Sequence, residues 1–133
     1  MTVTLDDIDV MHVVAPGGPS GAPAAFHALE APLNSLKGRR FYGTYLAGEH
    51  RACVAIEPGD DPAAFGLPTW TIPGGKFEKR KLMDWQNRLP DIGATFIAMA
   101  REFNADESRA SVEFYRSTRE LVLFLPVSQA GRR

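Results

Sequence analysis

The chain lacks the cysteines that a disulfide framework or a cysteine-rich zinc site needs, because Cys53 is the only one in 133 residues. It also lacks any apolar run near the ~18 residues that would span a bilayer. Its first ten residues, MTVTLDDIDV, are acidic where a secretory signal would be basic and then apolar. We therefore expect a cytoplasmic protein without membrane association, and we interpret Cys53 as an inert thiol in the core.

The chain has no excess of charge of either sign, with 15 Lys and Arg against 16 Asp and Glu. A dedicated nucleic-acid binder usually has a strongly basic face, so no direct nucleic-acid binding is expected. A hydrophobic content of 44% at this length is enough for one core, and we predict a single domain over residues 1–133. The basic run 76–81 favours a solvated strand or loop over a phosphate-binding patch.

Histidine is scarce, with three in the chain. His12, His27 and His50 fall on a predicted strand, a predicted helix and a predicted turn, without a short-range pair at ligand spacing. We therefore expect neither a metal site nor a cofactor. The segment Gly74-Gly75-Lys76 lacks the rest of a phosphate-binding loop and is interpreted as a backbone bend.

The first half of the chain contains signals for a strand, a helix and a β-hairpin. An apolar, β-branched strand is predicted over 9–14. A helix is predicted over 20–36 from apolar residues at spacings of 3, 4 and 3, with a kink or restart at Pro32 because proline lacks the donor that an interior turn needs. Strands over 39–46 and 51–56, joined by 47–50, then form a predicted hairpin.

The second half repeats these signals after a turn-rich connection over 57–68. One strand, interrupted by a bend at 73–75, is predicted over 69–85. A helix follows, with Asp91 as its N-cap and with Phe96, Met99 and Phe103 on a stripe that we expect to be buried against the sheet. Two strands over 110–117 and 120–127 complete a second hairpin.

Both halves, about 8–57 and 68–127, therefore have the order strand, helix, strand, strand. Arg40-Phe41-Tyr42 in the first hairpin is placed like Glu113-Phe114-Tyr115 in the second, which favours a diverged duplication. The predicted fold class is α+β, with duplicated βαββ halves related by a pseudo-twofold axis. Its sheets are expected to be antiparallel, because each half ends in a hairpin.

Three segments resemble the GyrI-like small-molecule-binding domain, which is the effector-binding domain of multidrug-sensing regulators. They are Phe41-Tyr42-Gly43, the segment Trp-Thr-Ile-Pro-Gly-Gly-Lys-Phe over 70–77, and the terminal pair 112–115 and 120–127. The resemblance implies two βαββ halves related by a pseudo-twofold axis, with the helices outside and a ligand groove between the halves. Because no helix-turn-helix segment flanks the domain, we expect a stand-alone member that does not bind DNA in cis.

Glu113 is the position that matches the glutamate with which that family contacts cationic drugs. Side chains alternate along a strand, so Glu113 and Tyr115 share one face, which we expect to point away from the helices. From this orientation we predict that Glu113 lies at the floor of the largest pocket. The candidate aromatic ligand contacts are Tyr42, Tyr45, Trp70, Trp85 and Tyr115. Alternatively, Glu113 forms a structural ion pair with Arg40, its counterpart in the repeat alignment.

Three functions remain open at this point. The first is capture of amphipathic, cationic or polycyclic small molecules. The second, implied by some stand-alone members of the family, is hydrolysis of strained electrophiles such as cyclopropane-containing genotoxins, with Glu113 as the catalytic residue. The third is a protein-interaction module of the gyrase-inhibitor type.

Overall fold

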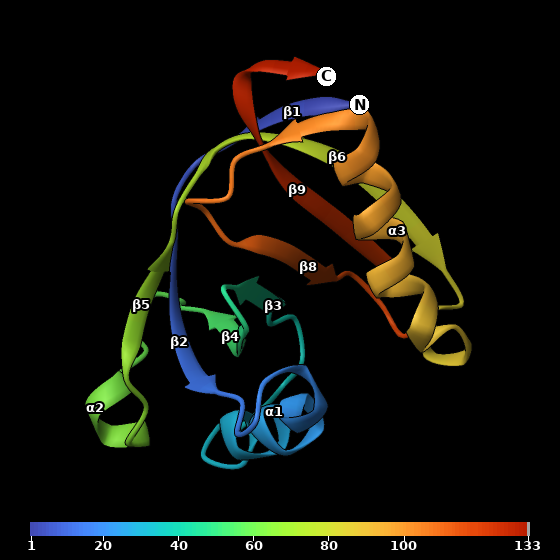
Figure 1. Ribbon diagram of the computed structural model, residues 1–133. Helices are drawn as coiled ribbons and strands as arrows, with labels where there is room; N and C mark the ends of the chain where they lie inside the picture. Colours follow the sequence, from blue (N-terminus) through green and yellow to red (C-terminus); the bar gives the residue numbers. More distant parts are fainter. Residues whose placement is uncertain (133) are drawn as a thin grey trace.

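The computed structural model describes residues 1–132 and, for side chains, residues 1–128. Its helices are α1 (Ala22–Glu30), the short α2 (Pro62–Phe65) and α3 (Leu89–Glu102), with 3-10 turns at Pro19–Gly21 and Trp85–Asn87. Its strands are β1 (Thr2–Leu5), β2 (Ile8–Val14), β3 (Phe41–Leu46), β4 (Glu49–Ala55), β5 (Thr69–Ile72), β6 (Gly75–Met83), β7 (Phe103–Ala105), β8 (Ser111–Tyr115) and β9 (Glu120–Arg132). The fold is α+β (Figure 1).

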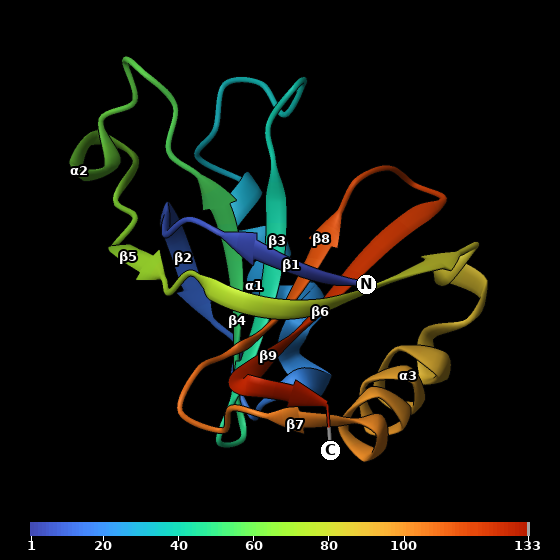
Figure 2. The same ribbon diagram turned by 90° about the horizontal axis from the view of Figure 1, so that it is seen from above.

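The strands form one antiparallel sheet in the order β1-β6-β9-β8-β3-β4-β2-β5, and β7 pairs with β9. Two residues separate β1 from β2, and two separate β5 from β6, while β1 pairs with β6 and β2 pairs with β5. The strands β1 and β6 therefore lie at one edge of the sheet, and β2 and β5 lie at the other edge. Each bent segment contributes one strand to each of these two edges. As a result the sheet curls back on itself into a half-barrel (Figure 2).

The two bends approach each other closely at Gly74, within the predicted break over 73–75. A Cβ atom at this position would lie 2.3 Å from the carbonyl oxygen of Leu5 and 2.6 Å from the carbonyl carbon of Asp6. The Gly74 backbone N–H donates to the Asp7 carboxylate at 2.7 Å. Glycine is needed here because the neighbouring atoms are backbone and cannot turn away.

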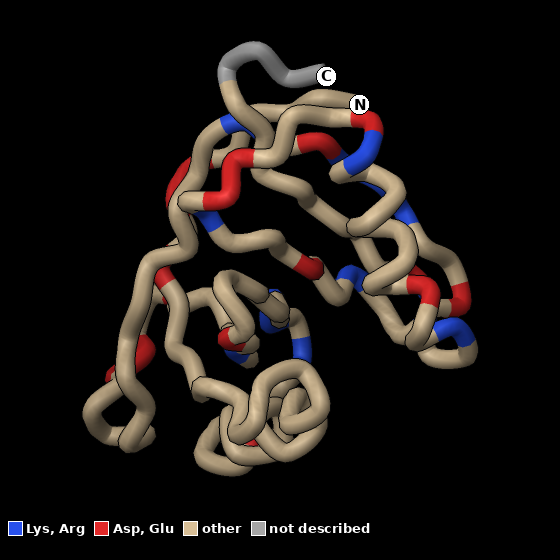
Figure 3. Tube along the Cα trace, in the orientation of Figure 1, with Lys and Arg blue, Asp and Glu red and all other residues tan. Residues whose placement is uncertain are grey.

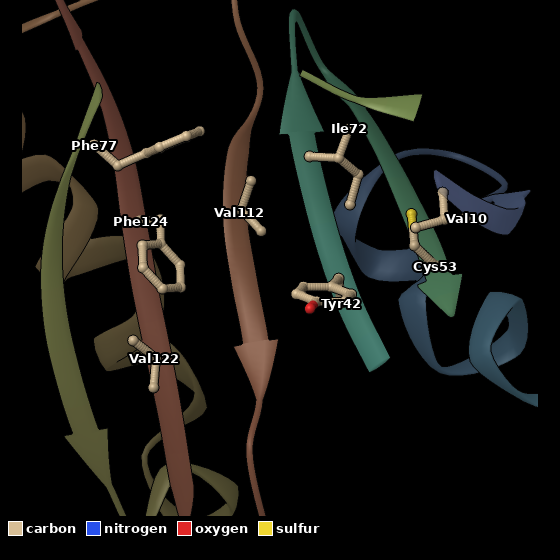
Figure 4. Close-up of a cluster of buried hydrophobic side chains, with 8 residues drawn as sticks. All are labelled: Val10, Tyr42, Cys53, Ile72, Phe77, Val112, Val122 and Phe124. Atoms are coloured by element: carbon tan, nitrogen blue, oxygen red, sulfur yellow. The ribbon is translucent and has the colours of Figure 1, made fainter. Parts of the chain in front are cut away.

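Three buried clusters hold the fold together. The first fills the inside of the curl (Figure 4) and consists of Val10, Tyr42, Cys53, Ile72, Phe77, Val112, Val122 and Phe124. The second lies under α1 and includes Leu29, Ala52 and Val54. The third lies under α3 and includes Met99, Leu121 and Leu123. Neighbouring residues such as Ala52 and Cys53 belong to different clusters, so the strands are apolar on both faces.

The helices differ in extent from the predictions. Helix α1 ends at Glu30, before Pro32, and no helix resumes up to Leu36. Ala31 keeps helical backbone angles, but Pro32 has no N–H to donate to the carbonyl of Ala28, which explains the stop. Helix α3 begins at Leu89, so Asp91 lies in its first turn and its assignment as N-cap was wrong. Pro90 occupies a first-turn position, where its missing N–H costs nothing. The Asp91 carboxylate instead accepts a hydrogen bond from Arg88 at 2.8 Å.

The predicted stripe on α3 faces the sheet. Met99 is fully buried, and Phe96 is partly buried against the same cluster. Phe103 is also partly buried against that cluster, but its placement on the helix was wrong, because α3 ends at Glu102 and Phe103 begins β7. None of the helices within residues 1–132 has both the length and the apolar character that crossing a membrane requires.

The first hairpin turns more tightly than predicted. Its loop is Ala47-Gly48, and both residues have positive φ, 50° and 84°, as a type I′ turn requires. Strand β4 therefore starts at Glu49, and the placement of His50 in the turn was wrong, because His50 pairs with Tyr45 inside the ladder.

The element order β2-α1-β3-β4 is followed by β6-α3-β8-β9 with β7 inserted after α3, and the residue alignment proposed between the two halves does not hold. The units β2-α1-β3-β4 and β6-α3-β8-β9 meet at the β3–β8 pair in one continuous sheet. However, Phe41 packs against the cluster under α1, whereas Phe114 packs against the cluster inside the curl. Two residues that face opposite ways are not equivalent, so aligning the two Phe-Tyr pairs was wrong. Superposition of the halves remains a prediction.

The close approach at Gly74 predicts that Gly74→Ala lowers the free energy of unfolding by about 1–3 kcal/mol, as overpacking does. Gly93 on α3 is the matched control, since a Cβ there has no heavy atom within 4 Å. Gly93→Ala should raise stability by about 0.5–1 kcal/mol, because alanine favours helix. Urea denaturation measures both. Equal effects of the two substitutions would contradict the close approach.

Candidate ligand-binding site

A pocket of about 760 Å³ opens between α1 and α3, over the middle of the sheet. Strands β3, β4 and β8 form its floor. Its walls come from α1 with the 3-10 turn before it, and from Trp85 with the first turn of α3. The lining residues include Pro23, Phe26 and Glu30 on one wall, Trp85, Leu89 and Ile92 on the other, and Phe41, His50, Glu113 and Tyr115 at the floor. Glu30 is the charged residue of α1, which Figure 3 shows as almost uncharged.

Three polar side chains meet at the floor. Oε1 of Glu113 accepts a hydrogen bond from the Tyr115 hydroxyl at 2.6 Å, and Nε2 of His50 lies 3.8 Å from the same oxygen. The side chains of Glu113 and His50 are 14% and 6% exposed. Glu113 and Tyr115 come from β8 and His50 from β4, so two strands on either side of β3 supply the group.

Gly43 on β3 provides the space in which these side chains meet. It is the residue directly opposite Glu113 in the β3–β8 ladder. A Cβ atom at Gly43 would lie 2.7 Å from Glu113 Oε1, 3.1 Å from the Tyr115 hydroxyl and 3.2 Å from His50 Nε2. Any side chain here would displace the polar group, and this explains a glycine in the middle of a strand.

The electrostatics of the floor follow from its burial. Burial, the Glu113 charge and the hydrogen bond to Glu113 together raise the pKa of Tyr115, so the phenol stays protonated and keeps donating. The hydrogen bond leaves the negative charge of Glu113 in place. A carboxylate with little water around it and apolar walls above it attracts a cation more strongly than a solvated carboxylate does.

An aromatic row fixes the position of Tyr115. Its ring meets Phe26 of α1 edge-on and Trp85 at a tilt, with ring centroids 5.2 Å apart in both pairs. The Trp85 indole donates to the carbonyl oxygen of Ser117 at 3.1 Å. The row thus links both walls of the pocket across its floor.

The structure brings together three of the six predicted site residues and separates the others from them. Glu113, Tyr115 and Trp85 line the pocket. Tyr42 lies inside the curl and stacks on Phe114, with centroids 5.0 Å apart. Trp70 lies beneath the Arg51 guanidinium, which is 4.2 Å from its ring centroid, at a separate hollow of about 290 Å³. Tyr45 is 44% exposed and does not line the pocket.

The expected orientation of Glu113 was wrong. Glu113 does not point away from the helices, because the pocket that it lines is walled by α1 and by the approach to α3. The argument assumed that one face of β8 packs under helices and the other is free. In fact Val112, on the opposite face, packs inside the curl.

Arg40 takes no part in the site. It precedes β3 and is exposed, and Glu113 lies opposite Gly43. Among the described side chains, no ion pair joins Arg40 to Glu113. The hydrogen bond from Tyr115 takes the place of the predicted pair.

His50 is the floor residue that sequence reasoning missed. Its signal was the alternation His50, Ala52, Val54, which places the imidazole on the same face as two small apolar residues. Placing His50 in the turn hid this signal. Within residues 1–132, no three His, Cys, Asp or Glu side chains cluster as ligands of a metal ion would. Cys53 faces the inside of the curl, and burial raises its pKa to about 12, which keeps the thiol protonated.

Comparison with known proteins establishes the fold. No family model and no curated protein matches the chain. Among solved structures, an integron cassette protein from the mobile metagenome of Vibrio cholerae is 12% identical, with a TM-score of 0.71 over 96% of this chain and 95% of that one. SAV2435 bound to tetraphenylphosphonium is 14% identical, with a TM-score of 0.60 over 98% and 94%. A hydrolase from Listeria innocua is 11% identical, with a TM-score of 0.61 over 96% and 90%. These likenesses show that the chain shares its fold with these proteins.

The raised pKa of Tyr115 predicts how stability depends on pH. Above pH ~10 the unfolded chain loses the phenol proton while the folded chain keeps it, so this contribution to stability is present below pH 10 and lost as pH rises further. Tyr115→Phe should lower the free energy of unfolding by about 1.5–3 kcal/mol at pH 8, the range for a hydrogen bond to a charged group. The difference should shrink by pH 11.

Chemical denaturation at pH 8, 10 and 11 measures this difference. Tyr45→Phe is the control, because Tyr45 is 44% exposed and should change stability little at any of these pH values. A Tyr115→Phe difference that stays constant from pH 8 to 11 would show that the Tyr115 phenol is not protected from ionisation.

Proposed function

We propose that this protein binds amphipathic, cationic small molecules in the pocket between α1 and α3. The observation that carries the proposal is the Glu113 carboxylate, 14% exposed at the floor of a largely apolar pocket. A buried carboxylate is costly unless an opposite charge comes close. A ligand with a positive charge and a hydrophobic body can pair with Glu113 at the floor and pack against the apolar walls.

The walls suit such a ligand in size and in chemistry. A volume of about 760 Å³ is within the range of pockets that enclose drug-sized molecules. The rings of Tyr115 and Trp85 offer faces that attract cations through their quadrupoles. Phe26 and Ile92 offer apolar area on opposite walls. Charge and shape are thus selected together, without a dedicated hydrogen-bond pattern.

The fold comparison supports the same class of ligand. SAV2435, which has this fold, was solved with tetraphenylphosphonium, a permanent cation surrounded by four phenyl groups. We take this compound as the first probe for the present chain. In the proposal, Glu113 supplies the charge, Tyr115 orients the carboxylate, and Trp85 forms part of the wall. Tyr42, Tyr45 and Trp70 lie outside the proposed site.

Hydrolysis of a strained electrophile is the second candidate function. His50 and Tyr115 flank Glu113, and solved structures with this fold include a hydrolase from Listeria innocua. Here Glu113 would accept a proton from water as the water oxygen bonds to a cyclopropane carbon. The ring C–C bond would break, and its electron pair would pass into a conjugated carbonyl group that then takes up a proton.

The binding proposal predicts that Glu113→Gln weakens tetraphenylphosphonium binding by about 1.5–3 kcal/mol, which is about 10- to 150-fold in Kd. Triphenylphosphine oxide, a neutral ligand with three phenyl groups, should lose much less. Isothermal titration calorimetry measures both. Glu107→Gln is the matched control, because Glu107 is exposed and does not line the pocket. Equal losses for the two ligands would mean that Glu113 only shapes the pocket.

The hydrolase candidate makes a different prediction for the same substitution. Incubation with a cyclopropane-containing electrophile should give a ring-opened product with wild-type protein and none with Glu113→Gln, while binding of the electrophile persists. Mass spectrometry of the products measures turnover. Absence of a ring-opened product from wild-type protein across a panel of such compounds argues against this candidate and leaves the binding proposal intact.

A further inference from the structure

The structure assigns a second role at the pocket floor: we infer that His50 sets the cation selectivity of the pocket. When its imidazole is protonated, it becomes the internal partner of Glu113, and the pocket loses its preference for cations over neutral ligands. When the imidazole is neutral, the charge of Glu113 is left for the ligand. This inference rests on the proposed function and concerns the regulation of the same site.

The geometry permits this competition. Nε2 of His50 lies 3.8 Å from Oε1 of Glu113, which is within ion-pair distance and beyond hydrogen-bond distance. Both atoms point into the space above Gly43, and both side chains line the pocket. A protonated imidazole would therefore place its charge beside the carboxylate and in the path of an arriving cation.

The imidazole has few other polar neighbours. Its Nδ1 is buried and has no hydrogen-bond partner among the described residues. Its backbone is anchored, because the His50 carbonyl oxygen accepts a hydrogen bond from the Ala15 N–H at 2.8 Å. The ring is thus held in place by packing, and Glu113 is the charged group that its Nε2 faces.

Other titratable groups come toward His50 from the elements packed around it. Strand β8 contributes Tyr115 besides Glu113, and strand β3 contributes Tyr45, the partner of His50 in the ladder. Helix α1 contributes Glu30 on the pocket wall, whereas the lining residues at the start of α3 are the uncharged Leu89 and Ile92. On β4 itself, the neighbouring residues Glu49 and Arg51 line the separate hollow with Trp70.

The effect on ligands follows from charge alone. A positive charge about 4 Å from a carboxylate with little solvent offsets most of its attraction for a second cation. Burial of apolar rings is insensitive to that charge. Protonation of His50 therefore penalises the cation and leaves a neutral ligand of similar shape nearly unaffected.

The test measures Kd for tetraphenylphosphonium and triphenylphosphine oxide from pH 8.0 to 5.5 at constant ionic strength. Neither probe titrates in this range, so any pH dependence belongs to the protein. We expect tetraphenylphosphonium to bind wild-type protein at least about tenfold more weakly at pH 5.5, and the oxide to change less than about twofold. His50→Gln should remove the pH dependence. His27→Gln, on the exposed side of α1, should retain it.

Protonation of Glu113 itself is the competing explanation. It would weaken cation binding at low pH equally in wild-type protein and in His50→Gln. The same pH dependence in both proteins therefore overturns the inference. Absence of tetraphenylphosphonium binding at every pH is a different result, because it contradicts the proposed function.

A second measurement needs neither a ligand nor a His50 variant. The ring signal of His50, followed by NMR across the same pH range, should respond to pH differently in Glu113→Gln and in wild-type protein, because the substitution removes the carboxylate 3.8 Å from Nε2. The His27 signal is the internal control. An unchanged His50 midpoint shows that the two groups are not coupled and overturns the inference.

Discussion

The curl of the sheet keeps the two long helices apart, and the site depends on that separation. Helix α1 packs over β2 and β4, and α3 packs over β9 and β7, because the apolar residues that anchor each helix lie toward opposite ends of the strand order. The central pair, β3 and β8, is left between them. The row of Phe26, Tyr115 and Trp85 spans this gap, and the middle of the sheet becomes the floor of a pocket.

Hydrogen bonding stabilises the polar floor of the pocket, but the central strands lose side-chain packing there. Gly43 gives up the side-chain packing that a central strand normally uses, and in exchange Glu113, Tyr115 and His50 fit in one layer. The cluster inside the curl offsets this cost, since it contains residues such as Val10, Phe77 and Val122 that are at most 2% exposed. The buried residues of this cluster do not line the pocket, so they stabilise the fold without contacting a ligand there.

Much of the chain path could be predicted from the sequence, because strands, turns and helix stripes have local causes. The bend at Gly74 and the stripe around Met99 are of this kind. Orientation was not predictable in the same way. The alternation of side chains along β8 shows that Val112 and Glu113 lie on opposite faces of the sheet. It does not show which face the helices cover, because both faces are apolar. Tyr42 and Trp70 were assigned to the pocket for this reason. His50 was missed because a shift of two residues at a turn removed it from the ladder.

A comparison of two buried carboxylates shows why Glu113 stands out. Glu78, on β6, is 3% exposed, and it is neutralised within the chain by an ion pair with the N-terminal ammonium group and a hydrogen bond from the Thr2 hydroxyl at 3.0 Å. Glu113 has no such fixed cation. Its hydrogen-bond donor is the neutral Tyr115, and the cationic group within ion-pair range among the described residues is His50, which is charged only when protonated. A structural carboxylate carries its counter-ion with it, as Glu78 does. Glu113 instead faces a pocket from which the counter-ion must come, and the charge state of His50 determines whether a ligand has to supply it.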